Sequence, residues 1–216
     1  MSFDIERSHV IFKHLIHVGP DIDADAVVEL ATKRDYAKST RQLKTPRGPL
    51  KEYLLRPKTD PQSLLVFSRK GFVIDTKQSK KVLTLFRDAY DFYEKVIGDK
   101  ALNATVVMDV NGKFELYSPL PPMELVSNVT VLEPDTLTFS NHSVHTHGIV
   151  LASGSGKFPE EFIKLSIEPL GKDPDRRILA SVVYRSTELD EALKFIENID
   201  NSLLETLSKM KKFAKK

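Results

Sequence analysis

The stretch around which the chain is organised is residues 52–75, with the sequence EYLLRPKTDPQSLLVFSRKGFVID. It predicts short β-strands at residues 52–56, 64–68 and 72–75. The last two flank Arg69-Lys70-Gly71, where a tight turn needs a residue that tolerates an unusual φ. β-branched and aromatic residues, which favour strands, lie on both sides of this turn. The stretch therefore predicts a meander of strands.

The composition is that of an ordinary soluble globular protein, with 41% hydrophobic and 29% charged residues. No apolar run approaches the roughly 18 residues of a membrane span, and the start MSFDIERSHV lacks the apolar core of a signal peptide. We therefore expect a cytoplasmic protein. The chain contains no cysteine, which excludes disulfides, thiolate metal sites, iron–sulfur clusters and a cysteine nucleophile.

Elements on either side of the opening stretch complete the first hundred residues. An apolar, β-prone run predicts a strand at residues 10–18, and several aspartates then offer caps for a short helix that ends near Asp35. A further strand is predicted at residues 40–44. The apolar spacing of residues 79–97 predicts a helix that Gly98 ends.

From residue 104 onward the pattern changes to strands alone. Residues 105–110 and 113–118 flank Asn111-Gly112, which is a strong hairpin signal. Apolar runs predict the remaining strands. A long apolar stripe, with a capping box at Thr187 and Asp190, predicts a final helix. These are strands at residues 128–132, 136–140, 144–152, 162–170 and 178–185, and a helix at residues 188–213.

These elements predict an α+β protein with curved antiparallel sheets, each packed by helices. We expect two parts, residues 1–100 and residues 101–216, which could also pack as one unit. The second part is predicted to be an antiparallel sheet with a long C-terminal helix.

The first part resembles a single repeat of the TATA-binding protein family. The resemblance lies in Arg56-Pro57-Lys58-Thr59, Leu65-Val66-Phe67 and Val73, and it covers roughly residues 10–98. It implies a curved antiparallel sheet with helices on its convex side and a concave face that grips the DNA minor groove. In that family phenylalanines are inserted between bases, and Phe67 stands where one of them would be.

Side-chain alternation indicates which residues would lie on that concave face. We expect Leu64, Val66, Phe72 and Ile74 to lie under the helices, and Leu65, Phe67, Val73 and Asp75 to line the other face. No second repeat is visible, because residues 101–216 lack the helix that should follow a first strand. We therefore expect the Phe67 face to be covered by the second part, or by a partner chain such as a second copy.

A basic segment carries the leading prediction of function. Residues 33–58 contain nine basic residues against only Asp35 and Glu52. Such a segment favours a polyanion, although an ordinary solvated face would look the same. The leading hypothesis is a non-enzymatic protein that binds nucleic acid, with Phe67 as a stacking or wedge surface. The residues expected to neutralise phosphates are Lys44, Arg47, Lys51, Arg56 and Lys58.

Three histidines within six residues predict a metal site as an alternative. His145 and His147 would share one face of a strand, and His142 would reach in from the turn. Zinc is the metal considered for this cluster. The competing interpretation is that these side chains point into water.

A small-molecule carrier is the third hypothesis. An antiparallel sheet closed by a long amphipathic helix is typical of the helix-grip arrangement, which encloses an apolar cavity. The alternative is that the same side chains simply fill the core. The residues that would line the cavity are Phe114, Leu116, Phe139, Ile149, Leu151, Ile163, Leu165 and Val183.

Overall fold

The computed structural model describes residues 2–46, 48–98, 104–127, 129, 138–139, 142–143, 147–154 and 161–213. The elements of the first half of the chain are β1 (Asp4–Val18), α1 (Ala24–Thr32), β2 (Tyr36–Thr45), β3 (Gly48–Pro57), β4 (Leu64–Ser68), β5 (Gly71–Thr76) and α2 (Ser79–Ile97). Those of the second half are β6 (Thr105–Tyr117), α3 (Pro122–Ser127), β7 (Thr138–Phe139), β8 (His142–Ser143), β9 (Ile149–Gly154), β10 (Phe162–Pro169), β11 (Arg177–Ser186) and α4 (Leu189–Phe213).

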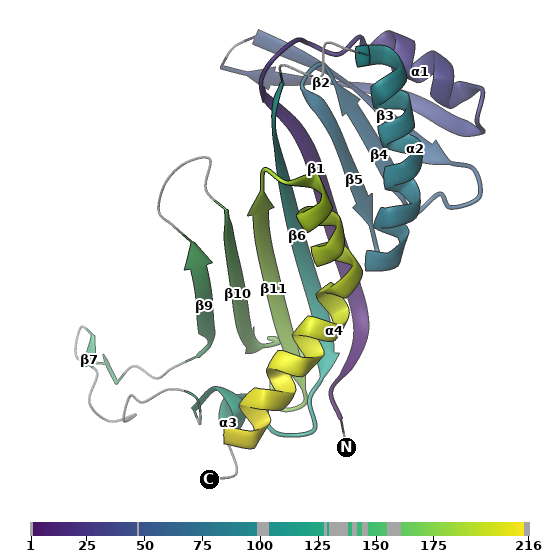
Figure 1. Cartoon of the computed structure of the whole chain (residues 1–216). Coiled ribbons are helices and arrows are strands. Elements are labelled where there is room, and N and C mark those ends of the chain that lie inside the picture. The colour runs from purple at the N-terminus through teal and green to yellow at the C-terminus, as the bar shows by residue number, and fades with distance from the viewer. Residues whose placement is uncertain are drawn as a thin grey trace.

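One antiparallel sheet runs through both halves (Figure 1). Among the described residues it has nine strands in the order β2-β3-β4-β5-β1-β6-β11-β10-β9, while β7 and β8 form a separate pair. The two halves meet where β1 and β6 pair along most of their length. The predicted α+β class is confirmed, with one continuous sheet in place of separate sheets. The predicted division near residue 100 stays a prediction.

The strand order is mirrored about the β1–β6 pair. In the first half β1 pairs with β5, β5 with β4 and β4 with β3; in the second half β6 pairs with β11, β11 with β10 and β10 with β9. A helix follows the first strand in each half, and a longer helix follows the last. The prediction that the second half lacks a helix after its first strand is wrong, because α3 occupies that place. It has only six residues, too few to give an apolar helical pattern in the sequence.

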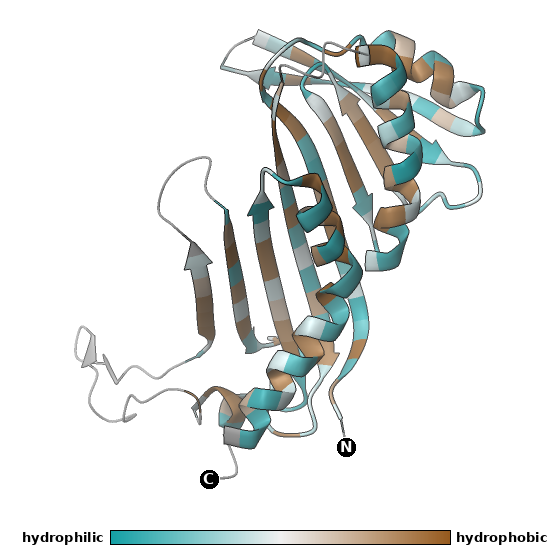
Figure 2. Cartoon of the chain, in the orientation of Figure 1, coloured by the Kyte–Doolittle hydropathy of each residue, from teal (hydrophilic) through white to brown (hydrophobic). Residues whose placement is uncertain are grey.

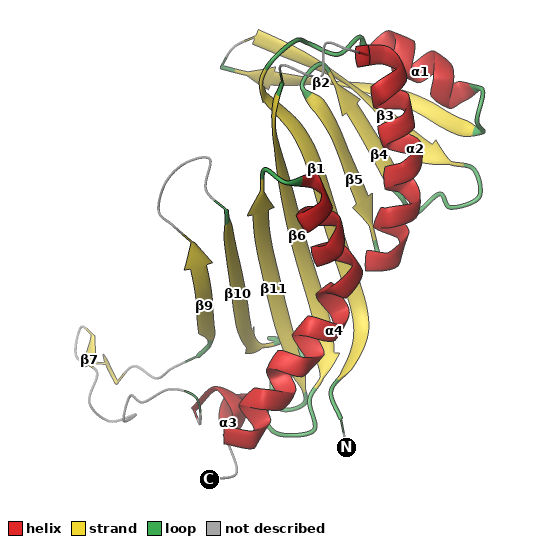
Figure 3. Ribbon diagram, viewed as in Figure 1, coloured by secondary structure: helices red, strands yellow, loops and turns green. Residues whose placement is uncertain are grey.

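The long helices lie on one side of the sheet (Figure 3). Helix α2 contacts β1 and β5, α4 contacts β6 and β11, and the two helices contact each other. Apolar residues recur along the central strands, as the brown segments of Figure 2 show. Those that face the helices form the core and are fully buried, for example Phe12, Phe72, Ile74, Val110 and Phe114.

Several predicted elements are confirmed closely. Strand β4 begins and ends at the predicted residues, and the turn at Arg69 and Lys70 leads directly into β5. Gly71 has a φ of 135°, and a Cβ atom there would lie 2.0 Å from the carbonyl oxygen of His14. Glycine is therefore required at this turn. Helix α2 covers residues 79–97 as predicted, and α4 begins one residue later than predicted.

The hairpin predicted at Asn111-Gly112 is wrong. Both residues lie inside the single strand β6, which pairs with β1 on one side and β11 on the other. Gly112 serves close packing instead of a turn, because a Cβ atom on it would lie 2.6 Å from Cε2 of Phe114 and 3.3 Å from Cδ1 of Ile199 on α4. The predicted strand at residues 128–132 falls almost wholly outside the described residues. Strand β9 begins at Ile149, inside the strand predicted at residues 144–152.

Candidate functional site

The face of the sheet opposite the helices is the candidate functional surface, and we call it the open face. Side chains alternate between the two sides of each strand. The strand register therefore places odd-numbered residues of β1, β5, β6 and β11, and even-numbered residues of β10, on the open face. Unlike their neighbours under the helices, most of these residues are half-buried or exposed. They include His9, Ile11, Lys13, Leu15, Val73, Asp75, Asp109, Asn111, Lys113, Glu115, Leu179, Val183, Arg185 and Lys164.

Carboxylates on the open face are paired with bases on adjacent strands. The guanidinium of Arg185 donates to both carboxylate oxygens of Asp109, over 2.6 and 3.1 Å, and this contact raises the pKa of Arg185. His9 Nε2 lies 2.6 Å from Oδ1 of Asp75. Arg7 lies 3.8 Å from Glu115. The charge of Asp109 is therefore largely offset at close range, and that of Asp75 is offset when His9 is protonated.

Three lysines on the open face have no such partner. Lys13 on β1, Lys113 on β6 and Lys164 on β10 form no ion pair with any residue that the structure describes. Lys13 lies opposite Val73 and Asp109, Lys113 opposite His9 and Ser181, and Lys164 opposite Val183 and Ala152. The open face thus carries unpaired positive charge across its central strands.

The basic segment predicted to bind phosphates does not form one surface. Lys44 and Lys51 lie on the helix side of β2 and β3, whereas Arg56 lies on the open face and donates to the carbonyl oxygen of Pro61. Lys51 contacts Asp25 at 3.4 Å, and Lys58 contacts Asp35 at 2.9 Å. Two of these charges are therefore already paired within the chain. Arg47 lies outside the described residues.

The prediction that Phe67 lies on the open face is wrong. The side chain is fully buried, on the helix side of the sheet, with its ring 5.4 Å from that of Phe72. The two-residue turn pairs Phe67 with Phe72 and Leu65 with Ile74, so odd residues of β4 share a side with even residues of β5. The sequence interpretation had matched even residues with even residues. Because Phe67 is covered by the chain itself, it offers no stacking surface to a ligand.

The histidine cluster falls mainly outside the described residues. The side chain of His142 and the whole of His145 are not described, and His147 is exposed. Among the residues that are described, no three histidine, aspartate or glutamate side chains converge as metal ligands do. The zinc hypothesis stays a prediction.

The described residues form one small groove between α4 and the sheet that could hold a ligand. It measures about 70 Å³ and lies between Ile163, Leu165 and Val182 on the sheet and Phe195, Ile199 and Leu203 on the helix. Pockets for small molecules usually measure about 300–1,000 Å³. Of the predicted lining residues, Phe114, Leu116 and Ile149 are buried in the core, and Val183 lies on the open face. The side chain of Phe139 is outside the described residues.

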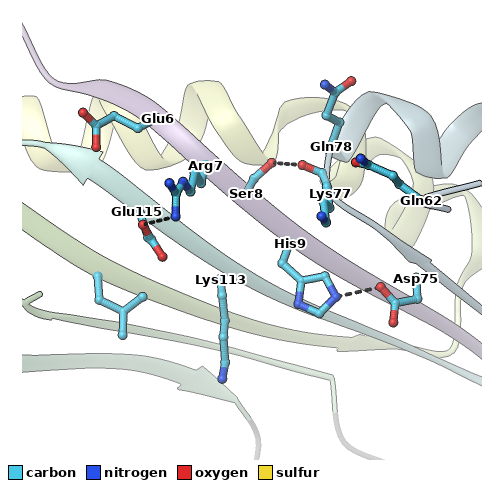
Figure 4. Close-up of a pocket in the computed structure, with 11 residues that line it drawn as sticks. Glu6, Arg7, Ser8, His9, Gln62, Asp75, Lys77, Gln78, Lys113 and Glu115 are labelled. Atoms are coloured by element: carbon cyan, nitrogen blue, oxygen red, sulfur yellow. Dashed lines mark hydrogen bonds and ion pairs between the residues drawn. The ribbon is translucent and has the colours of Figure 1, made fainter. Parts of the chain in front are cut away.

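A larger groove lies on the open face, beside His9 (Figure 4). It measures about 710 Å³ and is lined by β1, β6 and the connection from β5 to α2. The partners of His9 could not be found by pattern, because Asp75 and Lys113 lie 66 and 104 residues further along the chain.

Comparison with protein-family models, with curated proteins and with solved structures finds no match to this chain. In the described part of the chain, no helix combines the length and apolarity that crossing a membrane requires.

Proposed function

We propose that this protein is a non-enzymatic nucleic-acid-binding protein that holds duplex DNA against the open face of its sheet. The observation that carries the proposal is a set of lysines, Lys13, Lys113 and Lys164, that form no ion pair with the described residues and lie on a sheet face that no described helix covers. Lysines that neutralise backbone phosphates supply most of the affinity of sequence-independent DNA binding.

The arrangement of the sheet also supports this proposal. A single repeat resembling the TATA-binding protein would need a second copy to form a saddle, whereas here two halves with mirrored strand order lie in one sheet. Apolar residues such as Ile11, Leu179 and Val183 lie between the charges of the open face. A surface of this kind offers apolar contact to sugars and bases while lysines contact phosphates.

The proposed contact differs from the one predicted by sequence. It excludes Phe67 and moves from β2 and β3 to β1, β6 and β10, which carry Lys13, Lys113 and Lys164. Intercalation of that phenylalanine between bases is therefore no part of the proposal. Affinity should come from phosphate contacts and should depend little on DNA sequence.

Fluorescence anisotropy with a short labelled duplex tests the proposal. Three phosphate contacts predict a slope of about −2.7 in log K against log salt, or roughly 40-fold weaker binding between about 50 and 200 mM salt. Replacing Lys13, Lys113 and Lys164 together by glutamine should remove most of that slope. The matched control replaces Lys33, Lys80 and Lys172, which are exposed and lie outside the open face. Absence of binding at low salt, or equal slopes for both triple variants, would refute the proposal.

A further inference from the structure

The groove beside His9 combines a large volume with an uneven distribution of charge. It is formed where β1 and β6 run side by side and the connection from β5 to α2 rises beside them (Figure 4). Its bases are Arg7, His9, Lys77 and Lys113, and its acids are Glu6, Asp75 and Glu115. With about 710 Å³ of space it has ample room for a phosphoryl group and its substituents.

His9 is held in place by its two neighbouring strands. Its Nε2 atom lies 2.6 Å from Oδ1 of Asp75 on β5, and it is directly opposite Lys113 on β6. Figure 4 shows the ring between these two side chains. The His9 side chain is 47% exposed, and its Nδ1 atom has no partner among the described residues. A protonated ring therefore directs one N–H group at Asp75 and leaves the other for a ligand.

The remaining acids of the groove already face cations. Glu115 lies 3.8 Å from Arg7, and Glu6 lies 3.2 Å from Arg177. The ammonium groups of Lys113 and Lys77 have no carboxylate partner in the part of the chain that is described. When His9 is protonated, the groove thus has more positive than negative charge, which favours an anion.

We propose that this groove is a phosphate-binding site, in which Lys113 Nζ and the Nδ1–H of protonated His9 donate to the oxygens of one phosphoryl group. Asp75 orients the imidazolium by accepting from Nε2, and Lys77 adds charge at the rim. Charge-assisted hydrogen bonds of this kind are among the strongest in proteins. The phosphoryl group comes either from the backbone of DNA, in which case the site rests on the proposed function, or from a free phosphorylated small molecule.

An NMR titration of the full chain with inorganic phosphate tests the site. We expect the largest changes at the His9 ring and the Lys113 side chain. His9→Gln and Lys113→Gln should each weaken binding about tenfold, because each removes one charge-assisted hydrogen bond. His17→Gln and Lys172→Gln replace exposed residues outside the groove and should leave it unchanged. Equal binding by all four variants, or changes spread evenly over the lysines, would overturn the site.

The same variants with a short DNA duplex separate the two sources of phosphate. Weaker DNA binding by His9→Gln supports a backbone phosphate in the groove. Phosphate binding at His9 and Lys113 without any DNA binding supports a free phosphorylated ligand and refutes the proposed function alone. DNA binding that Lys113→Gln weakens but His9→Gln leaves unchanged, with no response to inorganic phosphate at His9, refutes the site and leaves the proposed function standing.

Discussion

The two halves of the sheet share one strand order but differ in how well their helix side is covered. In the first half α1 contacts β3 and β4, whose inward-facing residues Leu55, Leu65 and Phe67 are fully buried. At the corresponding strands of the second half, Leu151 on β9 is 42% exposed and Ile163 on β10 is 37% exposed. The helices in the corresponding places also differ in length, since α1 has nine residues and α3 has six. Equal topology therefore does not bring equal burial.

The two edge strands differ in the same direction. Strand β2 carries Lys38, Arg41 and Lys44, all exposed, and charges of this kind discourage pairing with another chain. Strand β9 has the sequence IVLASG, with Val150 60% exposed and no charge. The first half is thus both better packed and better protected at its edge.

Truncating one buried leucine should expose this difference most strongly. Leu65→Ala removes a fully buried side chain from β4, and we expect the free energy of unfolding to fall by about 2–5 kcal/mol. Ile163→Ala, at the corresponding strand of the second half, should cost about 1 kcal/mol or less because its side chain is partly exposed. Urea unfolding measures both values. Equal losses would mean that the two halves are equally well packed.

Acid should destabilise the first half through His14. This residue is buried against Phe72 and Tyr93, and its burial lowers its pKa to about 4. Because the ordinary pKa is about 6.5, the neutral ring stabilises the fold fully above pH 6.5, and this stability is lost as the pH falls toward 4. The loss amounts to about 3 kcal/mol.

The second half offers a matched replacement for this histidine. Met108 on β6 lies directly opposite His14 and is also buried, so His14→Met gives both strands the same residue. The variant should lose less stability than the parent chain between about pH 7 and 4. Urea unfolding at both pH values measures the difference. Parallel losses would show that carboxylates alone cause the acid sensitivity.

A substitution at Gly112 tests how tightly β6 is packed in the second half. The residue opposite Gly112 on β1, in the first half, is Val10. Gly112→Ala places a Cβ atom against the buried ring of Phe114, and we expect a loss of about 1–3 kcal/mol. Gly171→Ala is the control, because a Cβ atom there meets nothing within 4 Å. Thermal or urea unfolding compares the two. A neutral Gly112→Ala variant would show that the ring moves freely and that the second half is loosely packed throughout.

A hydrogen bond between the long helices should have the smallest effect. Ser79 Oγ on α2 donates to Oδ2 of Asp200 on α4 over 2.7 Å, which links the two halves. Ser79→Ala should cost about 1 kcal/mol. Ser208→Ala, which removes only a bond to the carbonyl of Leu204 within α4, should cost less. If both variants lose the same free energy of unfolding in urea, the hydrogen bond between Ser79 and Asp200 does not stabilise the contact between the two halves.

Local patterns predicted many elements of this fold but few of the contacts between them. Residues 64–68, the turn before Gly71 and helix 79–97 were found because each is specified by its own sequence. Asn111-Gly112 was misinterpreted because two distant strands hold this segment in an extended conformation. Its partners on β1 lie 100 and 102 residues earlier, and those on β11 lie 72 and 70 residues later. A neighbouring strand can override a local turn preference.

The candidate site depended even more on distant partners. The side on which Phe67 lies is decided by a one-residue difference in hairpin register, which reverses every side chain of the strand. His9, Asp75 and Lys113 come together only once β1 is placed between β5 and β6. Charge counted along residues 33–58 could not show that Lys51 and Lys58 pair with Asp25 and Asp35.

The position of β1 between β5 and β6 also matters while the chain is being synthesised. Strand β1 can pair with β5 once residue 76 has been made, but its other edge has no partner until β6 is complete at Tyr117. For that interval a growing chain exposes the backbone of a long strand whose residues 10–12 and 14–16 are largely apolar. Nascent chains of this protein are therefore expected to be most prone to aggregation, and most dependent on chaperones, at lengths between these two points.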